Sequence, residues 1–279
     1  MRHENRPPRR RTRLTRRGRL AILLGTLLAI GAAALVPLLR GAAPGPEKPR
    51  LLLIPEGWRA SQVYAAVDRE LKVPPGTTKA AAAAAGPALP AEAKGNPEGF
   101  LFPAAYPVTS TTTPDQLLAH MVRTAHQKLA TKPVAGGGRT HGMTPYQTAT
   151  LASIIQAEAE TPADMGKVAR VVHNRLARSM PLQMDSTINY ALNRHTVDTT
   201  LSDTRIDSPF NTYARQGLPP TPIANPGLAA LAAAVAPTPG DWLFFVTVKP
   251  GDTRFSATYE EHRRHVAEFN ALRAASRRT

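Results

Sequence analysis

Apolar residues recur at helical spacing along much of the chain. After Thr144-Pro145, a pair typical of a helix start, the residues Leu151, Ile154 and Ile155 lie at i, i+3 and i+4. This spacing places side chains on one face of an amphipathic helix. Comparable stripes predict helices from Ser61, Thr113, Thr161 and Asn225. The residues expected on the inward faces of these helices are Val63, Val67, Leu71, Leu117, Leu118, Met121, Val122, Val168, Val171, Val172, Leu176, Leu228, Leu231, Ala232 and Val235.

Two stretches have the composition of strands. Leu51–Ile54 is a short apolar run that suits a buried strand, and Trp242–Val248 is β-branched and aromatic. The turn residues Pro250–Asp252 predict that a second strand follows and ends near Ala257. A last helix is expected from Thr258, with His262, Val266, Phe269 and Leu272 buried. Helices and strands in this order predict an α+β fold.

Two other segments lack such a pattern. Pro74–Lys94 contains the run Ala80–Ala85 and several prolines and glycines, so we expect a mobile insertion outside the core. Gly136–Gly138 is expected to be a flexible loop because three successive glycines disfavour regular structure.

The N-terminal region is basic and then apolar. Residues 20–39 carry no charge and are flanked by Arg19 and Arg40. As a helix they would extend about 30 Å, the thickness of the hydrocarbon core of a bilayer. The arginines before this span predict a cytoplasmic tail at 1–19, with the rest of the chain outside the membrane. A cleaved signal peptide is the alternative, since residues 32–34 are alanines.

The formal net charge of +15 invites a nucleic-acid interpretation. However, residues 1–19 hold nine arginines and only one acidic residue, and this tail directly precedes the apolar span. We therefore do not expect nucleic-acid binding. The chain has no cysteine, and no metal, nucleotide or serine-hydrolase motif is present. No cofactor is expected.

Glu158 occupies the next position of the apolar stripe, at i+7 from Leu151. Burial raises the pKa of a carboxyl because it disfavours the charged form, and a glutamic acid protonated near neutral pH can act as a general acid. The alternative is a helix that ends here with Glu158 in solvent. Glu160, about 200° further around the helix, fits that description better.

Polar residues between the predicted helices could line the same site. Gln183 and Asp185 precede a short helical pattern, and Asp185 or Ser186 could equally be its N-cap. Asn211 and Tyr213 lie in a long loop and could bind a sugar through amide hydrogen bonds and ring stacking. The alternative for Asn211 and Tyr213 is that they only fasten the loop to its own backbone.

Taken together, the chain resembles the YceG-like family over roughly residues 51 to 270. The resemblance is carried by these blocks: Leu151–Glu158, Asn174–Leu176, Leu182–Asp185, Asn211–Tyr213, Gly217–Pro220, Ile223–Gly227, Phe244–Val246, Phe255 and Glu261-His262. Ile54–Gly57 and Glu98–Pro103 also resemble the family's small LysM-like domain and its junction with the catalytic domain. Asp185-Ser186-Thr187 stands where the family has Asp-Pro-Thr.

The resemblance implies a domain order. After the tail at 1–19 and the transmembrane helix at 20–39, a linker at 40–49 leads to a LysM-like α/β domain at 50–110, which carries the Ala/Pro-rich insertion. An α+β catalytic domain follows at 111–279. The implied location is the cell membrane, with the catalytic domain extracytoplasmic.

The resemblance also implies an activity: lytic transglycosylase cleavage of the MurNAc-β-1,4-GlcNAc bond in nascent glycan strands, with Glu158 as the catalytic acid. Gln183, Asp185, Asn211 and Tyr213 are the expected substrate-binding residues. The expected partners are peptidoglycan strands, the membrane and peptidoglycan synthases. Two alternatives remain: a non-catalytic wall-binding scaffold, and a hydrolase in which Asp185 is a second catalytic carboxylate.

Overall fold

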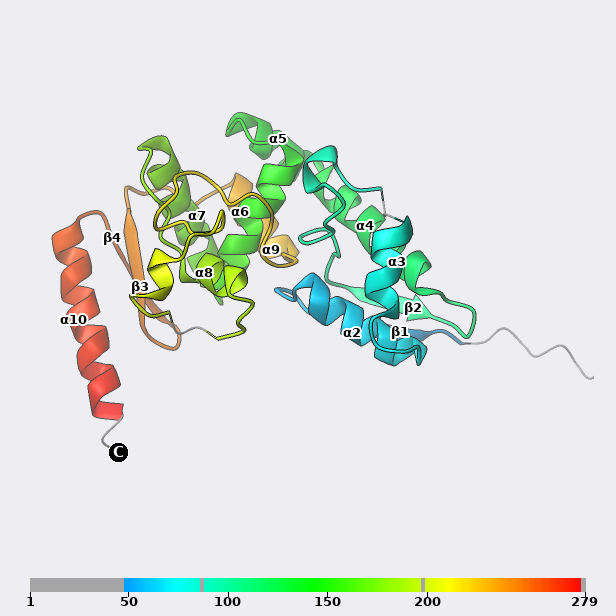
Figure 1. The fold of residues 1–279 in the computed structure, drawn as a ribbon. Coiled ribbons are helices and arrows are strands. Elements are labelled where there is room, and N and C mark those ends of the chain that lie inside the picture. Colours follow the sequence, from blue (N-terminus) through cyan, green and yellow to red (C-terminus); the bar gives the residue numbers. More distant parts are fainter. Residues whose placement is uncertain (1–47, 86–87, 197–198, 277–279) are drawn as a thin grey trace, which may run out of the picture. The chain divides into compact units, whose positions relative to one another are not determined.

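The computed structural model describes residues 48–85, 88–196 and 199–276, and Pro49–Thr279 form one compact unit (Figure 1). Its mixture of helices with two small antiparallel sheets confirms the α+β prediction. The predicted tail at 1–19, the span at 20–39 and most of the linker lie outside the described residues. Among the helices that are described, none is long and apolar enough to cross a membrane.

The N-terminal part of this unit pairs β1 (Arg50–Leu53) with β2 (Ala105–Val108) and packs α2 (Ala60–Leu71) beside them. The predicted strand and helix both form, and Val63 and Val67 are fully buried. The expected burial of the strand is wrong on one face, since Leu51 and Leu53 are 67% and 66% exposed. We did not predict β2, which is four residues long and contains a proline. Its pairing with β1 is a long-range contact that local pattern does not reveal.

The predicted mobile insertion is wrong for most of its length. Residues 77–85 form helix α3 (Thr77–Ala85), a short 3-10 helix η1 follows (Ala91–Ala93), and Ala82 and Ala93 are buried in the core. Alanine is the strongest helix former, so an alanine run needs only an anchor to pack. That anchor is Asp68, whose carboxylate accepts hydrogen bonds from the backbone N–H and hydroxyl of Thr78 at 2.8 and 2.6 Å.

The predicted glycine loop is also a helix. The chain forms α4 (Pro114–Leu129), as expected, and then α5 (Lys132–Thr140), which includes all three glycines. A Cβ on Gly137 would lie 2.7 Å from Cβ of Val235 in α9 (Leu228–Val235). Glycine at this position therefore allows two helices to approach closely, which outweighs its low helix propensity.

Three helices form the centre of the unit: α6 (Pro145–Glu158), α7 (Pro162–Ala177) and α9. Both predicted N-caps, Thr144 and Thr161, accept a hydrogen bond from the backbone three residues later. The inward face predicted for α9 is partly wrong, because Leu228 is 51% exposed and Ala232 is exposed. The helix begins only at Leu228, and its buried face is shifted toward neighbouring alanines.

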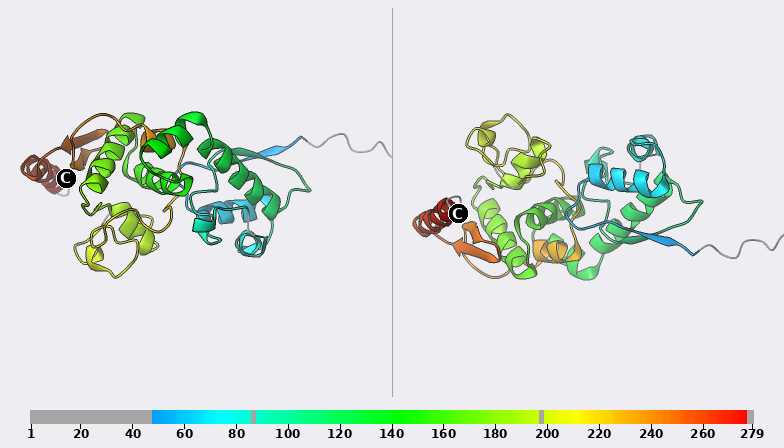
Figure 2. Two further views of the ribbon diagram at one scale, coloured as in Figure 1. Left: turned by 90° about the horizontal axis from the view of Figure 1, so that it is seen from above. Right: turned by 90° about the horizontal axis from the view of Figure 1, so that it is seen from below.

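The C-terminal part is a hairpin covered by one helix. Strands β3 (Phe244–Lys249) and β4 (Asp252–Ser256) pair as predicted, and α10 (Tyr259–Ser276) packs on β3. The predicted burial of this helix is only partly met: His262, Val266 and Phe269 are partly buried. For Leu272 it is wrong, since this residue is 44% exposed. Between α7 and α9, helix α8 (Asp185–Ala191) and the 3-10 helix η2 (Asp203–Arg205) belong to a lobe beside α7 (Figure 2).

Buried polar groups connect the N-terminal part to the central helices. The side chain of Asn225 donates to the carbonyl of Trp58 at 2.8 Å and accepts from the N–H of Leu101 at 2.8 Å. Glu98, which is 4% exposed, accepts from the N–H of Ala60 at 2.8 Å and lies 3.4 Å from the hydroxyl of Tyr190. Burial raises the pKa of Glu98 to about 7.

The close packing of α5 on α9 can be tested with two glycines of the same helix. Gly137→Ala should lower the free energy of unfolding by about 1–3 kcal/mol because the new methyl group collides with Val235. Gly136→Ala, whose Cβ would meet nothing within 4 Å, should raise it by about 0.5–1 kcal/mol. Urea denaturation of the fragment 49–279 measures both changes. Stabilisation by both substitutions would contradict the packing.

Glu98 should make the stability depend on pH. Because its pKa rises from 4.5 to about 7 on folding, its contribution is complete below pH 4.5 and is lost as the pH rises through 7. The loss is on the order of 3 kcal/mol. Glu98→Gln is neutral at every pH. The free energy of unfolding of the variant minus that of wild type should therefore be larger at pH 8.5 than at pH 5. An equal difference at both pH values, measured by urea denaturation, would refute this.

Candidate active site

Glu158 is the last residue of α6, and its carboxyl faces the start of α8. Oε1 accepts a hydrogen bond from the backbone N–H of Ser186 at 3.2 Å. The residue is partly exposed, but burial raises the pKa of the carboxyl, Ser186 opposes the rise, and the charge of Asp185 adds to it. A carboxyl held in this way is protonated over a wider pH range than an ordinary glutamate, as a general acid requires.

Asp185 and Tyr213 form a pair next to Glu158. The phenol of Tyr213 donates to Oδ1 of Asp185 at 2.5 Å. Burial, the hydrogen bond to Asp185 and the charge of Glu158 all raise the pKa of Tyr213, so the phenol stays neutral. The structure does not use Asp185 or Ser186 as an N-cap: Met184 is the N-cap of α8, and no side chain caps it.

Gln183 is exposed and lies just before α8, with its backbone in the left-handed region at a φ of 54°. Its N–H donates to the carbonyl of Thr212 at 2.9 Å, and its Oε1 accepts from Nη1 of Arg175 at 2.9 Å. The oxygen of the amide is therefore held by the protein. Its NH₂ group remains on the exposed side.

Arg175 is the buried residue that organises this region, and sequence reasoning missed it. From α7 its guanidinium donates to the carbonyls of Leu243, Pro181 and Leu182 at 2.6, 2.9 and 3.0 Å, in addition to Gln183. Only 5% of the residue is exposed. The sequence does contain a signal for its burial, because Arg175 lies at i+7 from Val168 on the apolar face of its helix. A charged residue on an apolar face is also what singled out Glu158.

Asn211 has no amide group left for a sugar. It is 1% exposed; its NH₂ donates to the carbonyls of Thr204 and Ile206, and its Oδ1 accepts from the N–H groups of Tyr213 and Ala214. The expectation of direct substrate contact by Asn211 is therefore wrong, and the alternative of a loop fastened to its own backbone applies. Asn211 fixes the loop that carries Tyr213.

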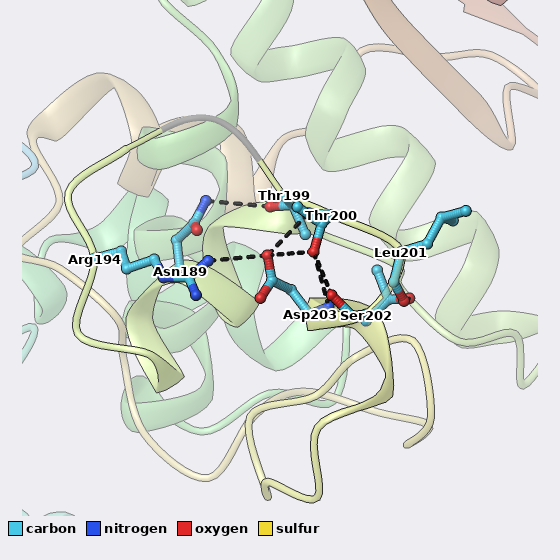
Figure 3. Close-up of polar contacts among 8 residues, drawn as sticks. Asn189, Arg194, Thr199, Thr200, Leu201, Ser202 and Asp203 are labelled. Atoms are coloured by element: carbon cyan, nitrogen blue, oxygen red, sulfur yellow. Dashed lines mark hydrogen bonds and ion pairs between the residues drawn. The ribbon is translucent and has the colours of Figure 1, made fainter.

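A second polar cluster lies within the same lobe (Figure 3). Oδ2 of Asp203 accepts from Nη1 of Arg194 at 2.9 Å and from the N–H and hydroxyl of Thr200 at 2.9 and 2.8 Å. Asn189, on α8, donates to the hydroxyl of Thr199 at 3.3 Å. These bonds connect α8 and the segment that follows it to η2.

A large open cavity lies elsewhere. A volume of about 650 Å³ is lined by residues at the start of α6, including Thr144, Tyr146 and Gln147, together with Leu218 and Pro219. Glu158, the last of the 14 residues of this helix, is not among the residues that line the cavity.

Metal ligation has little support among the residues that are described. No three histidine, cysteine, aspartate or glutamate side chains there lie close enough to share an ion. The rings of His141 and His173 are 4.3 Å apart, and His173 is bonded through Nε2 to the carbonyl of Ala234 at 2.8 Å.

The fold and the site define a class: an α+β protein whose general-acid candidate, Glu158, ends a central helix and faces a polar lobe. The family model described as the YceG-like family matches residues 30–268. The chain belongs to that family.

Curated relatives carry the name endolytic murein transglycosylase. The chain is 37% identical to the one from Bacillus subtilis over 166 residues, which are 59% of this chain and 46% of the relative. It is 34% identical to the one from Streptococcus pneumoniae D39 over 177 residues, 61% of this chain and 32% of the relative. The chain thus spans less than half the length of these relatives.

A solved structure is also similar. The crystal structure of a yceG-like protein from Listeria monocytogenes has a TM-score of 0.67 and 31% sequence identity, and the match covers 77% of this chain and 75% of that one. Its similarity extends through most of the described unit.

The role of Arg175 in the site can be tested with a conservative change. Arg175→Lys keeps the charge but cannot reach four acceptors, so it should lower the free energy of unfolding of the fragment 49–279 by about 2–4 kcal/mol. Arg178→Lys, in an exposed position three residues later, should stay within about 0.5 kcal/mol of wild type. Similar effects of the two substitutions in urea denaturation would show that the guanidinium does not organise the site.

Proposed function

We propose that the chain is an endolytic lytic transglycosylase of peptidoglycan with Glu158 as its acid and base. The observation that supports this best is the carboxyl of Glu158, whose pKa is raised by burial and by the charge of Asp185. The names of the curated relatives support the same substrate. The bond cleaved is the β-1,4 linkage between N-acetylmuramic acid and N-acetylglucosamine in nascent strands.

One carboxyl suffices for this reaction. Protonated Glu158 gives its proton to the glycosidic oxygen, and the bond from that oxygen to C1 of the muramic residue breaks. The carboxylate then takes the proton of the C6 hydroxyl, and the C6 oxygen attacks C1. A 1,6-anhydro ring closes, no water is consumed, and Glu158 returns to its protonated form.

The neighbouring residues have separate parts in this proposal. Asp185, held by the neutral phenol of Tyr213, favours the protonated form of Glu158 by its charge. Gln183 offers its exposed NH₂ group to acetamido or hydroxyl oxygens of the glycan, and Tyr213 lines the same face. Asn211 acts indirectly, through the loop that it fastens.

The surrounding organisation is part of the proposal. Residues 20–39 anchor the chain in the cell membrane, residues 1–19 lie in the cytoplasm, and a linker at 40–49 precedes a LysM-like domain at 50–110. The catalytic domain, 111–279, is extracytoplasmic, where the substrate is made. Peptidoglycan synthases are the proposed protein partners, because nascent strands are their product.

Glu158→Gln tests the proposal directly. It should lower the rate at which uncrosslinked glycan strands are cleaved by roughly 10³-fold, since general acid–base catalysis contributes about 10²–10⁴-fold. Glu160→Gln, two residues further and exposed, is the matched control and should keep wild-type activity. Mass spectrometry of the new strand ends should find anhydro-muramic ends.

Other outcomes distinguish the alternatives. Reducing ends would indicate a hydrolase in which Asp185 is a second catalytic carboxylate. If folded wild-type protein cleaves no strands, with or without membranes, the chain is not this enzyme and the scaffold interpretation replaces it.

A further inference from the structure

The sheet formed by β1 and β2, at the end of the described unit away from α10 (Figure 1), has one apolar face that is open to solvent. Leu51 and Leu53 of β1 are 67% and 66% exposed, and their partners across the sheet, Pro107 and Ala105, are exposed as well. Successive side chains of a strand point to opposite faces, so these four residues share one face, here called the outer face. None of the four side chains is polar or charged.

The inner face of the same sheet belongs to the core. Leu52, Tyr106 and Val108 lie on it and are buried. Arg50 is on this face too, opposite Val108, and its guanidinium pairs with Glu70 of α2 at 3.1 Å. Helix α2 therefore lies on the inner side of the sheet, while the leucines of the outer face remain exposed.

We propose that the outer face lies on the surface of the lipid bilayer, with Leu51 and Leu53 inserted at the boundary between headgroups and acyl chains. This inference rests on the anchor at residues 20–39 that is part of the proposed function. It goes beyond that anchor because it gives the bilayer a second contact, which the folded unit itself makes.

The length of chain between the anchor and β1 favours the bilayer as the occupant of the outer face. Residues 40–49 separate the apolar span from Arg50, the first residue of β1. Ten residues reach at most about 35 Å when fully extended. A sheet tethered this close to a surface meets it at a high effective concentration, so even a weak contact is occupied. A separate protein or a second copy of the chain has no such tether.

The chemistry of the outer face also fits lipid. Neighbouring exposed apolar side chains mark a surface that contacts another apolar phase. Burying two-thirds of a leucine side chain favours such a contact roughly tenfold, and the outer face offers two leucines. Lys48 and Arg50 are exposed and come just before them in the chain. Cations beside apolar residues favour anionic headgroups.

The absence of cysteine allows a probe to be attached at one chosen position. The chain has no cysteine, so Ala105→Cys gives a single site for the fluorophore NBD on the outer face and leaves both leucines in place. Ala65→Cys, at an exposed position of α2, is the matched control. The full-length variants are placed in nanodiscs of phosphatidylethanolamine and phosphatidylglycerol, one chain per disc, with or without lipids that carry a doxyl quencher in the acyl chain.

Doxyl lipids should quench the label at position 105 several times more strongly than the label at position 65, because only the first lies against lipid. Leu51→Ser together with Leu53→Ser, added to Ala105→Cys, should reduce the quenching at position 105 to that of the control label. The two leucines are exposed, so the melting temperature of this variant should stay close to that of its parent.

Equal quenching of the two labels, strong or weak, would overturn the inference, and the outer face would then have another occupant or none. Quenching at position 105 that persists without both leucines would overturn it as well. If the double substitution does not fold, Leu51→Ser alone decides, and it should weaken the quenching.

The anchor on which the inference rests is tested separately. A chain that alkaline carbonate extracts from liposomes would show that the anchor is wrong, and the inference would fail with it. A chain that resists extraction but shows no difference between the labels would refute the inference alone. Neither measurement depends on strand cleavage, so the proposed activity keeps its own test.

Discussion

The proposed chemistry depends on one constraint: the carboxyl of Glu158 is partly buried at the end of α6, and opposing influences act on its pKa. Burial and the charge of Asp185 favour the protonated form, while the N–H and hydroxyl of Ser186 favour the charged form. An acid that must later act as a base needs both forms to be accessible. The end of α6 and the start of α8 have to keep their relative position for this balance to persist.

Buried polar residues hold the segments around α8 in place. Arg175 donates to carbonyls in the segments before α8 and before β3, and Asn211 fastens the loop that carries Tyr213. Each is almost fully buried and has its hydrogen bonds inside the protein. Breaking either would leave several buried groups without partners, which costs more than an exposed contact would. In the proposed reaction these residues would act on the substrate only through those they position.

The capping residues and the spacing of apolar residues predicted the features that depend on neighbours in the sequence. Thr144 and Thr161 start helices as expected, and the apolar stripe through Leu151 correctly directed Glu158 toward the protein. Tertiary packing decided the rest. Gly137 is helical because α9 comes close, and the alanine run is ordered because Asp68 caps it. Nor could spacing show whether Asn211 faces a sugar or its own loop, since that depends on where the loop folds.

In the proposed reaction one carboxyl closes a ring without water. Strand cleavage in water enriched in oxygen-18, followed by mass spectrometry of the new ends, measures this directly. Anhydro-muramic ends that contain no oxygen-18 are expected, because the C6 oxygen of the same sugar replaces the leaving oxygen at C1. Reducing ends that carry oxygen-18 at C1 would contradict it, because water would then be the nucleophile.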